Sequence, residues 1–443
     1  MELKNENNFY GNEKISKILL KIAPPVMIAQ LIQALYNIVD SLFIGNYSDS
    51  GLNALSIVYP LQLLMIALAV GTGVGVNTIM AYQYGHGKNK IAKEYAGAGT
   101  ILIFIIWILF TILAWFLLPI YAKQQTDSSL VVKDVVSYGR IICIFGFGLF
   151  FESVWTKVCQ AEGDMRTPMI AQICGAITNI VLDPILIFGF LFIPEMGITG
   201  AAIASIIGQI VAALVVFKKG FRKFNSFNNF IYYTKQIFHY GLPNILMQSA
   251  YTFYIFGLNM ILATFSNEAV TALGLYYKWQ TIFFIPLGAM QICIVPIISY
   301  NFATKNIKRC KETLNLSIIF GILMMLIGTL CFEIIPSQML SVFSKNEEVI
   351  RIGTIGFRYI GISFIPLVTS LIFPVFFQAI GSSFKSSFLT VLRTVILFVP
   401  LGYILSLISL DIFWLTYIIT EIITSLVGFI FYHKFSKKYK KVI

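Results

Sequence analysis

Four polar side chains mark one face of an apolar stretch near the start of the chain: Gln30, Gln33, Asn37 and Asp40. Steps of three, four and three residues place them on one side of an α-helix, and Tyr36 lies beside them. Each unpaired polar group costs several kcal/mol in hydrocarbon, so this face must look into protein or a wet cavity. An acidic residue there predicts the handling of an ion or a substrate. A protonated Asp40 that serves only packing is the alternative.

A second polar pair has the same character. Asn179 and Asp183 are four residues apart and share a helix face, which Gln172 extends. Two carboxyl groups on different helices, with an amide beside them, can share a proton or coordinate a hard cation through oxygen. A buried network that only pins two helices together is the alternative. We predict a site for a coupling proton or cation, with Na⁺ as the possible metal ion, at these residues: Asp40, Asn179, Asp183, Asn37 and Tyr36.

The second half of the chain adds polar and aromatic side chains to its apolar runs. Aromatic surfaces with a few polar groups suit flat, greasy, cationic compounds, through apolar contact and cation–π attraction. The alternatives are ordinary aromatic packing and, for Lys278, snorkelling to the membrane surface. The residues that we predict to line a substrate cavity are Gln33, Gln172, Asn244, Gln248, Tyr251, Lys278 and Gln280.

The elements that carry these residues are long and apolar. Of the 443 residues, 58% are hydrophobic and 12% are charged, whereas soluble domains are about 45–50% apolar and about 25% charged. Runs of about 17–25 apolar residues can cross a bilayer as helices. We therefore predict an all-α polytopic membrane protein. Its twelve transmembrane helices are expected over residues 18–44, 54–82, 97–120, 138–160, 168–193, 197–217, 237–264, 272–300, 314–336, 354–379, 387–408 and 411–432.

The basic residues predict the orientation of these helices. Most of the 32 Lys and Arg residues fall on one side of the predicted spans, whereas only Lys123, Lys133, Lys345 and Arg351 fall in segments on the other side. The positive-inside rule then places both termini in the cytoplasm, in a multi-pass protein of the cytoplasmic membrane. The polar start of the chain, from Met1 to Lys17, shows no cleavable signal peptide. The net charge of +12 fits contact with anionic lipid headgroups, so nucleic acid is not needed as a partner.

The two halves of the chain repeat each other. A constant offset between the halves, without gaps, aligns Pro25 with Pro243 and Gln30 with Gln248. The offset spans six predicted helices, an even number, so both halves enter the membrane in the same direction. We predict two six-helix bundles related by a parallel pseudo-two-fold axis. The N-terminal bundle covers residues 1–217, a cytoplasmic linker covers 218–235, and the C-terminal bundle with a basic cytoplasmic tail covers 236–443.

The halves differ in the polar residues that they keep. In the repeat, Asp40 stands opposite Leu258 and Asp183 stands opposite Leu401. Ionisable side chains in the spans are therefore expected in the first half, and the coupling site is placed there. The roles of Glu152, Lys157 and Glu421 are left open, and Glu421 has no partner that the sequence reveals.

Other motifs carry no catalytic or metal chemistry. The six cysteines form no CxxC pair and are expected to pack in the core. Residues 71–75, GTGVG, lack the preceding strand and the following Lys-Ser/Thr of a nucleotide loop, so they predict close helix packing or a flexible point. No nucleophile and base are paired, so we expect no enzyme activity.

Three stretches resemble the multidrug and toxic compound extrusion (MATE) family of secondary transporters. They are YNIVDSLFIG at 36–45, AEGD at 161–164 followed by Pro168, and the segment 179–202, which ends in MGITGAA. The likeness covers essentially the whole chain. It implies an antiporter that exports compounds outward, driven by a proton or sodium gradient.

The resemblance also implies functional positions. In a prokaryotic branch, an Asp of the first helix and an Asn and Asp of the fifth helix form the cation site, and these fall on Asp40, Asn179 and Asp183. That branch often adds a hydroxyl from the sixth helix, for which the nearest positions here are Ala201 and Ala202. Another branch uses acidic residues of helices seven and ten, which the spans 237–264 and 354–379 lack.

The predicted function is therefore export of small amphipathic, cationic drugs or toxic compounds in exchange for H⁺ or Na⁺, by alternating access of two bundles. We expect a small organic molecule and membrane lipid as partners, a monomer, and no cofactor besides the coupling ion. A flippase for lipid-linked oligosaccharides, with a related architecture, is the alternative. It would favour a more cationic cavity, for which Lys278 is the one candidate residue in the sequence.

Overall fold

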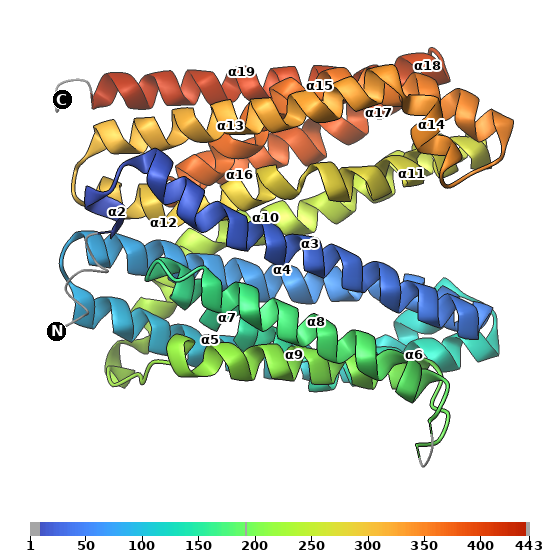
Figure 1. The fold of residues 1–443 in the computed structure, drawn as a ribbon, viewed down its shortest axis with the longest axis horizontal. Helices are drawn as coiled ribbons and strands as arrows, with labels where there is room; N and C mark the ends of the chain where they lie inside the picture. The colour runs from blue at the N-terminus through green and yellow to red at the C-terminus, as the bar shows by residue number, and fades with distance from the viewer. Residues whose placement is uncertain (1–8, 191–192, 440–443) are drawn as a thin grey trace. The chain divides into compact units, whose positions relative to one another are not determined.

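A computed structural model describes residues 9–190 and 193–439, and these residues are almost entirely helical (Figure 1). Within them, sheet-like pairing is limited to an isolated bridge between Phe190 and Ile193. The basic residues Lys4, Lys440 and Lys441 near the two termini lie outside the described residues, as do residues 191–192 of the span predicted over 168–193.

The helices follow one another with short connections. Their bounds are α2 (Phe9–Asn12), α3 (Ile15–Tyr47), α4 (Asp49–Gly85), α5 (Asn89–Gln125), α6 (Ser129–Phe145), α7 (Phe147–Ala161), α8 (Arg166–Ile187), α9 (Ile198–Gly220), η1 (Phe227–Asn229), α10 (Phe230–Ala263), α11 (Asn267–Phe283), α12 (Ile285–Ala303), α13 (Ile307–Ile334), α14 (Pro336–Ser341), α15 (Glu347–Ala379), α16 (Ser383–Val391), η2 (Leu392–Phe398), α17 (Val399–Ser406), α18 (Leu410–Phe413) and α19 (Leu415–Lys438).

The predicted membrane-spanning class is confirmed. Among the described residues, 11 helices or helical runs are long and apolar enough to cross a bilayer. The pair α6–α7, bent by 41° where the two helices meet, brings the number to as many as 12. The bend falls at Gly146, where a Cβ would lie 2.5 Å from the backbone oxygen of Ile142, so this contact favours glycine at the bend.

Other predicted spans are also broken into shorter helices. The span predicted over 272–300 consists of α11 and α12, which meet at Phe284, with Pro286 in the first turn of α12. Proline fits there because the first helical N–H groups have no intrahelical partner. The span predicted over 387–408 consists of α16, the π-helical segment η2 and α17. Hydropathy alone does not reveal such breaks, because the apolar character continues through them.

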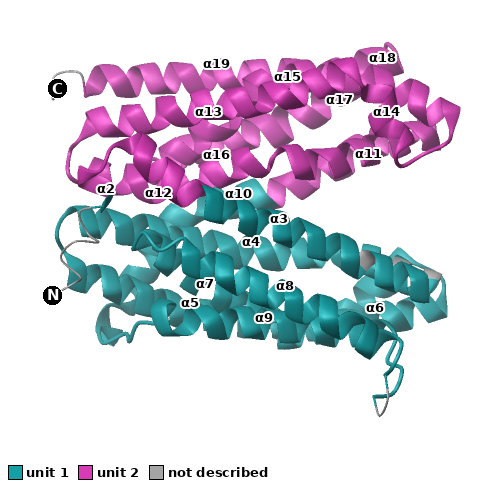
Figure 2. Ribbon diagram, in the orientation of Figure 1, with its two compact units in different colours: residues 1–9, 24–248 teal, residues 10–23, 249–443 magenta. Residues whose placement is uncertain are grey.

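The chain forms two compact units (Figure 2). Unit 1 contains Pro24–Gln248 together with the residues up to Phe9, and unit 2 contains Tyr10–Ala23 and Ser249–Ile443. The divisions fall within α3 and within α10. The non-helical connection from α9 to η1 falls inside the segment predicted as a linker, 218–235. The bundle boundaries 1–217 and 236–443 stay a prediction.

In unit 1 the glycine run of α4 packs closely against other helices. A Cβ on Gly73 would lie 2.8 Å from Ser153 O of α7, and one on Gly75 would lie 3.0 Å from Gly241 N of α10. Small residues at such crossings let helix backbones approach each other in a membrane. The structure therefore supports the packing interpretation of residues 71–75.

Unit 2 contains a buried ion pair that corrects one expectation. Ionisable groups in the spans were expected in the first half of the chain, and Glu421 was expected without a visible partner. Instead, Arg393 of η2 donates from Nη2 to Glu421 Oε1 of α19 at 2.6 Å and from Nε at 3.0 Å. Ser370 of α15 donates to the other carboxylate oxygen. The sequence does not show this pair because its members lie on different helices.

Candidate functional site

The candidate site lies within unit 1, where α3 and α8 pack together near their C-terminal ends. The rings of Phe43 and Phe188 lie 6.5 Å apart, and those of Tyr47 and Phe188 lie 5.9 Å apart. Asp40 precedes Phe43 by three residues on α3, and Asp183 precedes Phe188 by five residues on α8. At about 1.5 Å rise per residue, both carboxyl groups lie about one turn from this contact.

A close crossing of α8 and α9 positions the amide of Asn179. A Cβ on Gly208 of α9 would lie 2.7 Å from Gly175 O and 3.2 Å from Asn179 Cβ. Beside this crossing, Asn179 Nδ2 donates to Asp183 Oδ1 at 3.2 Å and to Ser205 Oγ at 3.4 Å. Asn179 thus connects the acidic group of α8 with a hydroxyl group of α9.

The hydroxyl group of Ser205 corrects the expectation for the sixth predicted helix. Ala201 and Ala202, the positions nearest to the hydroxyl that the resemblance implies, carry no hydroxyl group and are fully buried. Ser205 lies about one turn further along α9 and contacts Asn179. The crossing at Gly208 decides which residue of α9 faces Asn179, and this crossing cannot be located from the sequence of α9 alone.

The carboxyl groups of the site are buried and incompletely paired. Asp40 is 8% exposed and Asp183 is 0% exposed. The buried oxygens Asp40 Oδ1, Asn179 Oδ1 and Asp183 Oδ2 have no hydrogen-bond partner within the described protein. The charge of Asp40 acts on Asp183, so the two groups are electrostatically coupled. Buried polar atoms without partners are rare and costly, and a proton or a cation coordinated by oxygen would satisfy these three.

Two tyrosines complete the surroundings of the carboxyl groups. Tyr36, which was predicted for the site, interacts electrostatically with Asp40 and Asp183. Tyr138 of α6 does the same, and its Oη accepts a hydrogen bond from Gln62 Nε2 of α4 at 3.2 Å. Sequence reasoning missed Tyr138, because a single tyrosine in an apolar helix forms no polar stripe.

Gln172, predicted to line the substrate cavity, is engaged with a buried acid. Its Nε2 donates to Glu152 Oε1 of α7 at 2.9 Å, and Thr156 Oγ1 donates to the same oxygen at 2.7 Å. Lys157, one turn further on α7, donates from Nζ to Gln160 Oε1 at 2.9 Å. These contacts give Glu152 and Lys157 the partners that the sequence left open.

The other predicted cavity residues differ in exposure. Gln33 on α3 is exposed, as is Asn37, which was predicted for the coupling site. Asn244 on α10 is buried with its Oδ1 unpaired within the described protein. In unit 2, the rings of Tyr251 and Tyr254 lie 5.3 Å apart. The structure also describes Gln248, as half-buried, and Gln280, as buried.

Lys278 lies at the surface of unit 2. It is exposed, and its Nζ is 5.0 Å from the centroid of the Phe343 ring. This cation–π contact agrees with the snorkelling alternative, because the ammonium group stays accessible while its stem covers an aromatic ring. A role for Lys278 in a substrate cavity stays a prediction.

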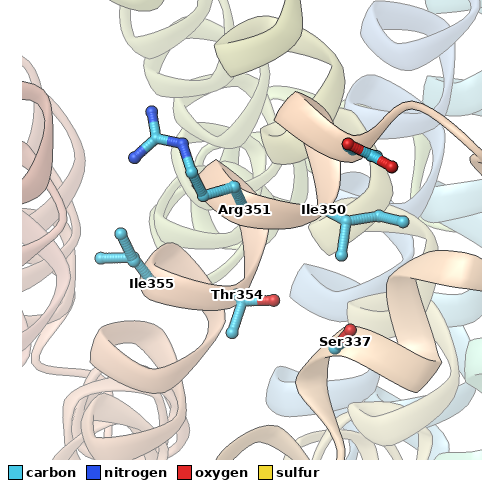
Figure 3. A pocket seen from close by; sticks show the side chains of 6 residues that line it. Ser337, Ile350, Arg351, Thr354 and Ile355 are labelled. Atoms are coloured by element: carbon cyan, nitrogen blue, oxygen red, sulfur yellow. The ribbon is translucent and has the colours of Figure 1, made fainter.

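A hollow of about 450 Å³ opens beside the first turns of α15 (Figure 3). Its lining residues come from α14 and α15, and none of them belongs to the predicted site. They are Ser337, Glu347, Ile350, Arg351, Thr354 and Ile355.

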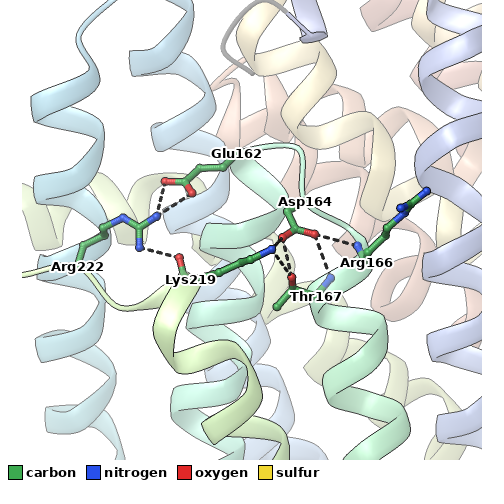
Figure 4. A network of polar contacts seen from close by, with 6 residues as sticks. All are labelled: Glu162, Asp164, Arg166, Thr167, Lys219 and Arg222. Carbon is green, nitrogen blue, oxygen red and sulfur yellow. Dashed lines mark hydrogen bonds and ion pairs between the residues drawn. The ribbon is translucent and has the colours of Figure 1, made fainter. Parts of the chain in front are cut away.

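The AEGD stretch at 161–164 forms a network at one end of unit 1 (Figure 4). Glu162 accepts from Arg222 Nη2 at 2.8 Å, and Asp164 accepts from Lys219 Nζ at 2.7 Å. Asp164 also accepts the backbone N–H of Thr167, in the first turn of α8. Burial alone would raise the pKa of Asp164, but the hydrogen bonds from Lys219 and Thr167 outweigh burial and hold the pKa below its ordinary value. These contacts fasten the α7–α8 loop to the end of α9.

Comparison with known proteins agrees with this architecture. The MatE family model matches the chain twice, over residues 25–185 and 243–404. The two matches begin at Pro25 and Pro243, the pair that the offset between the halves aligns, which confirms the internal repeat predicted from the sequence. The multidrug export protein MepA of Staphylococcus saprophyticus is 24% identical over 428 residues, covering 91% of this chain and 90% of MepA.

Two solved structures share the fold. One is the outward-facing conformation of a multidrug resistance MATE family transporter, with a TM-score of 0.91 and 22% identity over 99% of both chains. The other is a transporter of Pyrococcus furiosus whose binding pocket is described as reversed in polarity, with a TM-score of 0.90 and 22% identity over 98% of this chain and 99% of the other. From the two matches to its family model, the chain belongs to the MATE family of membrane transporters.

Proposed function

We propose that this chain exports small amphipathic, cationic compounds across the cytoplasmic membrane in exchange for H⁺ or Na⁺. The observation that carries this proposal is the set of unpaired, buried oxygens on Asp40, Asn179 and Asp183 within the described protein. The naming of its relative MepA as a multidrug export protein supports the substrate class. The distribution of Lys and Arg supports a cytoplasmic position for both termini.

The chemistry of the three residues suits a small cation. Asp40, Asn179 and Asp183 offer oxygen atoms, which bind a proton or a hard cation such as Na⁺. Ser205 Oγ adds a further oxygen near Asn179. Two buried carboxylates without a counter-ion are costly, so the site favours binding positive charge.

Exchange follows if the two ligands favour different conformations. A ligand shifts a conformational equilibrium only by its difference in affinity for the two states. The coupling ion has such a difference in affinity if it neutralises the charge of the carboxyl groups in one of the two states. The internal repeat supports alternating access, because transporters built from repeated bundles move one repeat against the other.

The test measures efflux of a fluorescent organic cation from proteoliposomes, under an imposed pH gradient and, separately, an imposed sodium gradient. Asp40→Asn and Asp183→Asn keep the shape of each side chain and remove its charge. Asp127→Asn makes the same change at an exposed residue between α5 and α6 and serves as the control. We expect one gradient to drive efflux in the wild type and in the control, and both site variants to lose it.

The outcomes separate the alternatives. Full gradient-driven efflux in Asp40→Asn and Asp183→Asn would refute the coupling site. Absence of efflux in the wild type under both gradients would refute cation-coupled drug export. Flipping of lipid-linked oligosaccharides would then be measured in the same vesicles.

A further inference from the structure

A groove on the surface of unit 1 is lined mostly by aromatic side chains. It has a volume of about 390 Å³ and runs between α5, α7 and α9. Its lining is formed by Thr100, Ile101, Phe104, Phe151, Trp155, Phe217 and Phe221. The volume is in the range of small-molecule sites, about 300–1,000 Å³.

The groove offers an apolar surface to its surroundings. Phe104 and Phe217 are each 43% exposed, and Phe221 is 42% exposed. The one polar atom of the aromatic lining is satisfied within the protein, because Trp155 Nε1 donates to Thr100 Oγ1 at 3.1 Å. An occupant therefore gains contact with aromatic rings and meets few polar groups.

The rings that line the groove pack against one another. Phe151 stacks on Trp155 with 5.1 Å between ring centroids, and Trp155 meets Phe217 edge to face at 5.2 Å. A Cβ on Gly220 would lie 2.7 Å from Trp155 Cα, so α9 and α7 touch directly behind the indole. The floor of the groove is thus fixed by contacts between helices and does not depend on an occupant.

Basic residues neighbour, along the chain, the lining residues Phe217 and Phe221 of the groove. Lys218 lies between Phe217 and Phe221 on α9, and Lys223 follows shortly after. The carbonyl oxygen of Lys223 would lie 2.9 Å from a Cβ on Gly97, so its backbone touches α5 about one turn before Thr100. Both lysines are exposed, and in the described part of the chain no acidic side chain pairs with either.

The neighbouring cations differ from these two. Lys219 is paired with Asp164, and Arg222 is paired with Glu162, as Figure 4 shows. The end of α9 and the segment after it therefore carry four basic residues, of which two are neutralised and two are free to attract an anion. Free lysines beside an apolar surface of a membrane helix match the charge of an anionic headgroup joined to an acyl chain.

We propose that this groove binds an anionic phospholipid, with an acyl chain along the aromatic rings and the headgroup phosphate held by Lys218 and Lys223. Zwitterionic lipid fits the rings equally well but carries a choline cation that the lysines repel. The selectivity therefore comes from the two lysines, and the position comes from the aromatic lining.

Quenching of tryptophan fluorescence tests the proposal on the full chain. The protein is reconstituted in phosphatidylcholine vesicles that contain increasing fractions of phosphatidylglycerol or phosphatidylcholine with brominated acyl chains. The signal of Trp155 is obtained as the difference between the wild type and Trp155→Phe. Brominated phosphatidylglycerol is expected to quench Trp155 at mole fractions at least about fivefold lower than brominated phosphatidylcholine.

Matched variants separate the groove from general surface charge. Lys218→Gln/Lys223→Gln is expected to bring the two brominated lipids to equal quenching. Lys305→Gln/Lys308→Gln removes the same charge from exposed positions of unit 2 and is expected to keep the preference. Equal quenching by both lipids in the wild type, or an equal loss of preference in both double variants, would overturn the proposal. The readout needs no transport, so it is independent of the proposed antiport.

Discussion

Replacing Glu421 by glutamine removes the negative charge from the buried pair of unit 2 and preserves the shape of the side chain. Arg393 is 7% exposed and Glu421 is 0% exposed, so water cannot compensate the guanidinium that is left behind. We expect Glu421→Gln to lower the free energy of unfolding by about 3–5 kcal/mol, the usual cost of removing one partner of a buried ion pair.

The contacts in the structure lead to the same magnitude. Arg393 donates to Glu421 from Nη2 at 2.6 Å and from Nε at 3.0 Å. Hydrogen bonds to charged groups contribute about 1.5–3 kcal/mol each, so the loss of two corresponds to about 3–6 kcal/mol. Ser370, which also donates to Glu421, would still find an oxygen acceptor on glutamine.

Unfolding in mixed micelles, titrated with sodium dodecyl sulfate and followed by tryptophan fluorescence, measures this change. Glu347→Gln, at an exposed position in the first turn of α15, is the control and should change the free energy of unfolding by less than about 0.5 kcal/mol. Arg393→Met/Glu421→Leu should recover most of the loss, because apolar residues of similar volume can replace a buried ion pair. A Glu421→Gln variant as stable as the control would refute the reasoning.

Three further predictions concern unit 1. Gly208→Ala should destabilise the protein by about 1–3 kcal/mol through overpacking. The control Gly274→Ala, where a Cβ meets nothing within 4 Å, should not destabilise it. Thermal unfolding compares the two variants, and equal stability would contradict the tight α8–α9 crossing. Ser205→Ala should weaken the gradient-driven efflux several-fold, as for the loss of one hydrogen bond of about 0.5–1.5 kcal/mol; efflux equal to that of the wild type would remove Ser205 from the site. Asp164 has a lowered pKa in the folded protein, so its charged form stabilises the fold. This contribution to the free energy of unfolding should be complete above the ordinary pKa of 3.8 and should be lost as the pH falls through the lower pKa of the folded protein. Unfolding of the wild type and Asp164→Asn across this range checks the sign, and a difference that grows as the pH falls would contradict it.

The sequence determined the class of this protein and the location of its polar helix faces. Hydropathy indicated the number of spans, and the constant register between the halves predicted the repeat that the two family matches confirm. The stripes of Asp40 and of Asn179 with Asp183 follow from helical periodicity, which depends only on residues within one helix. These features are local or depend on composition, so they can be derived from sequence.

Only the tertiary structure decided which side chains meet between helices. The partner of Glu421 lies on another helix, and the hydroxyl group near Asn179 comes from Ser205 because α8 and α9 cross at Gly175 and Gly208. Gln172, predicted for a cavity, contacts Glu152 for a similar reason. Hydrophobic runs show that helices exist, but the depth and rotation at which two helices cross depend on the packing of all their neighbours, and a shift of one turn changes which residues touch.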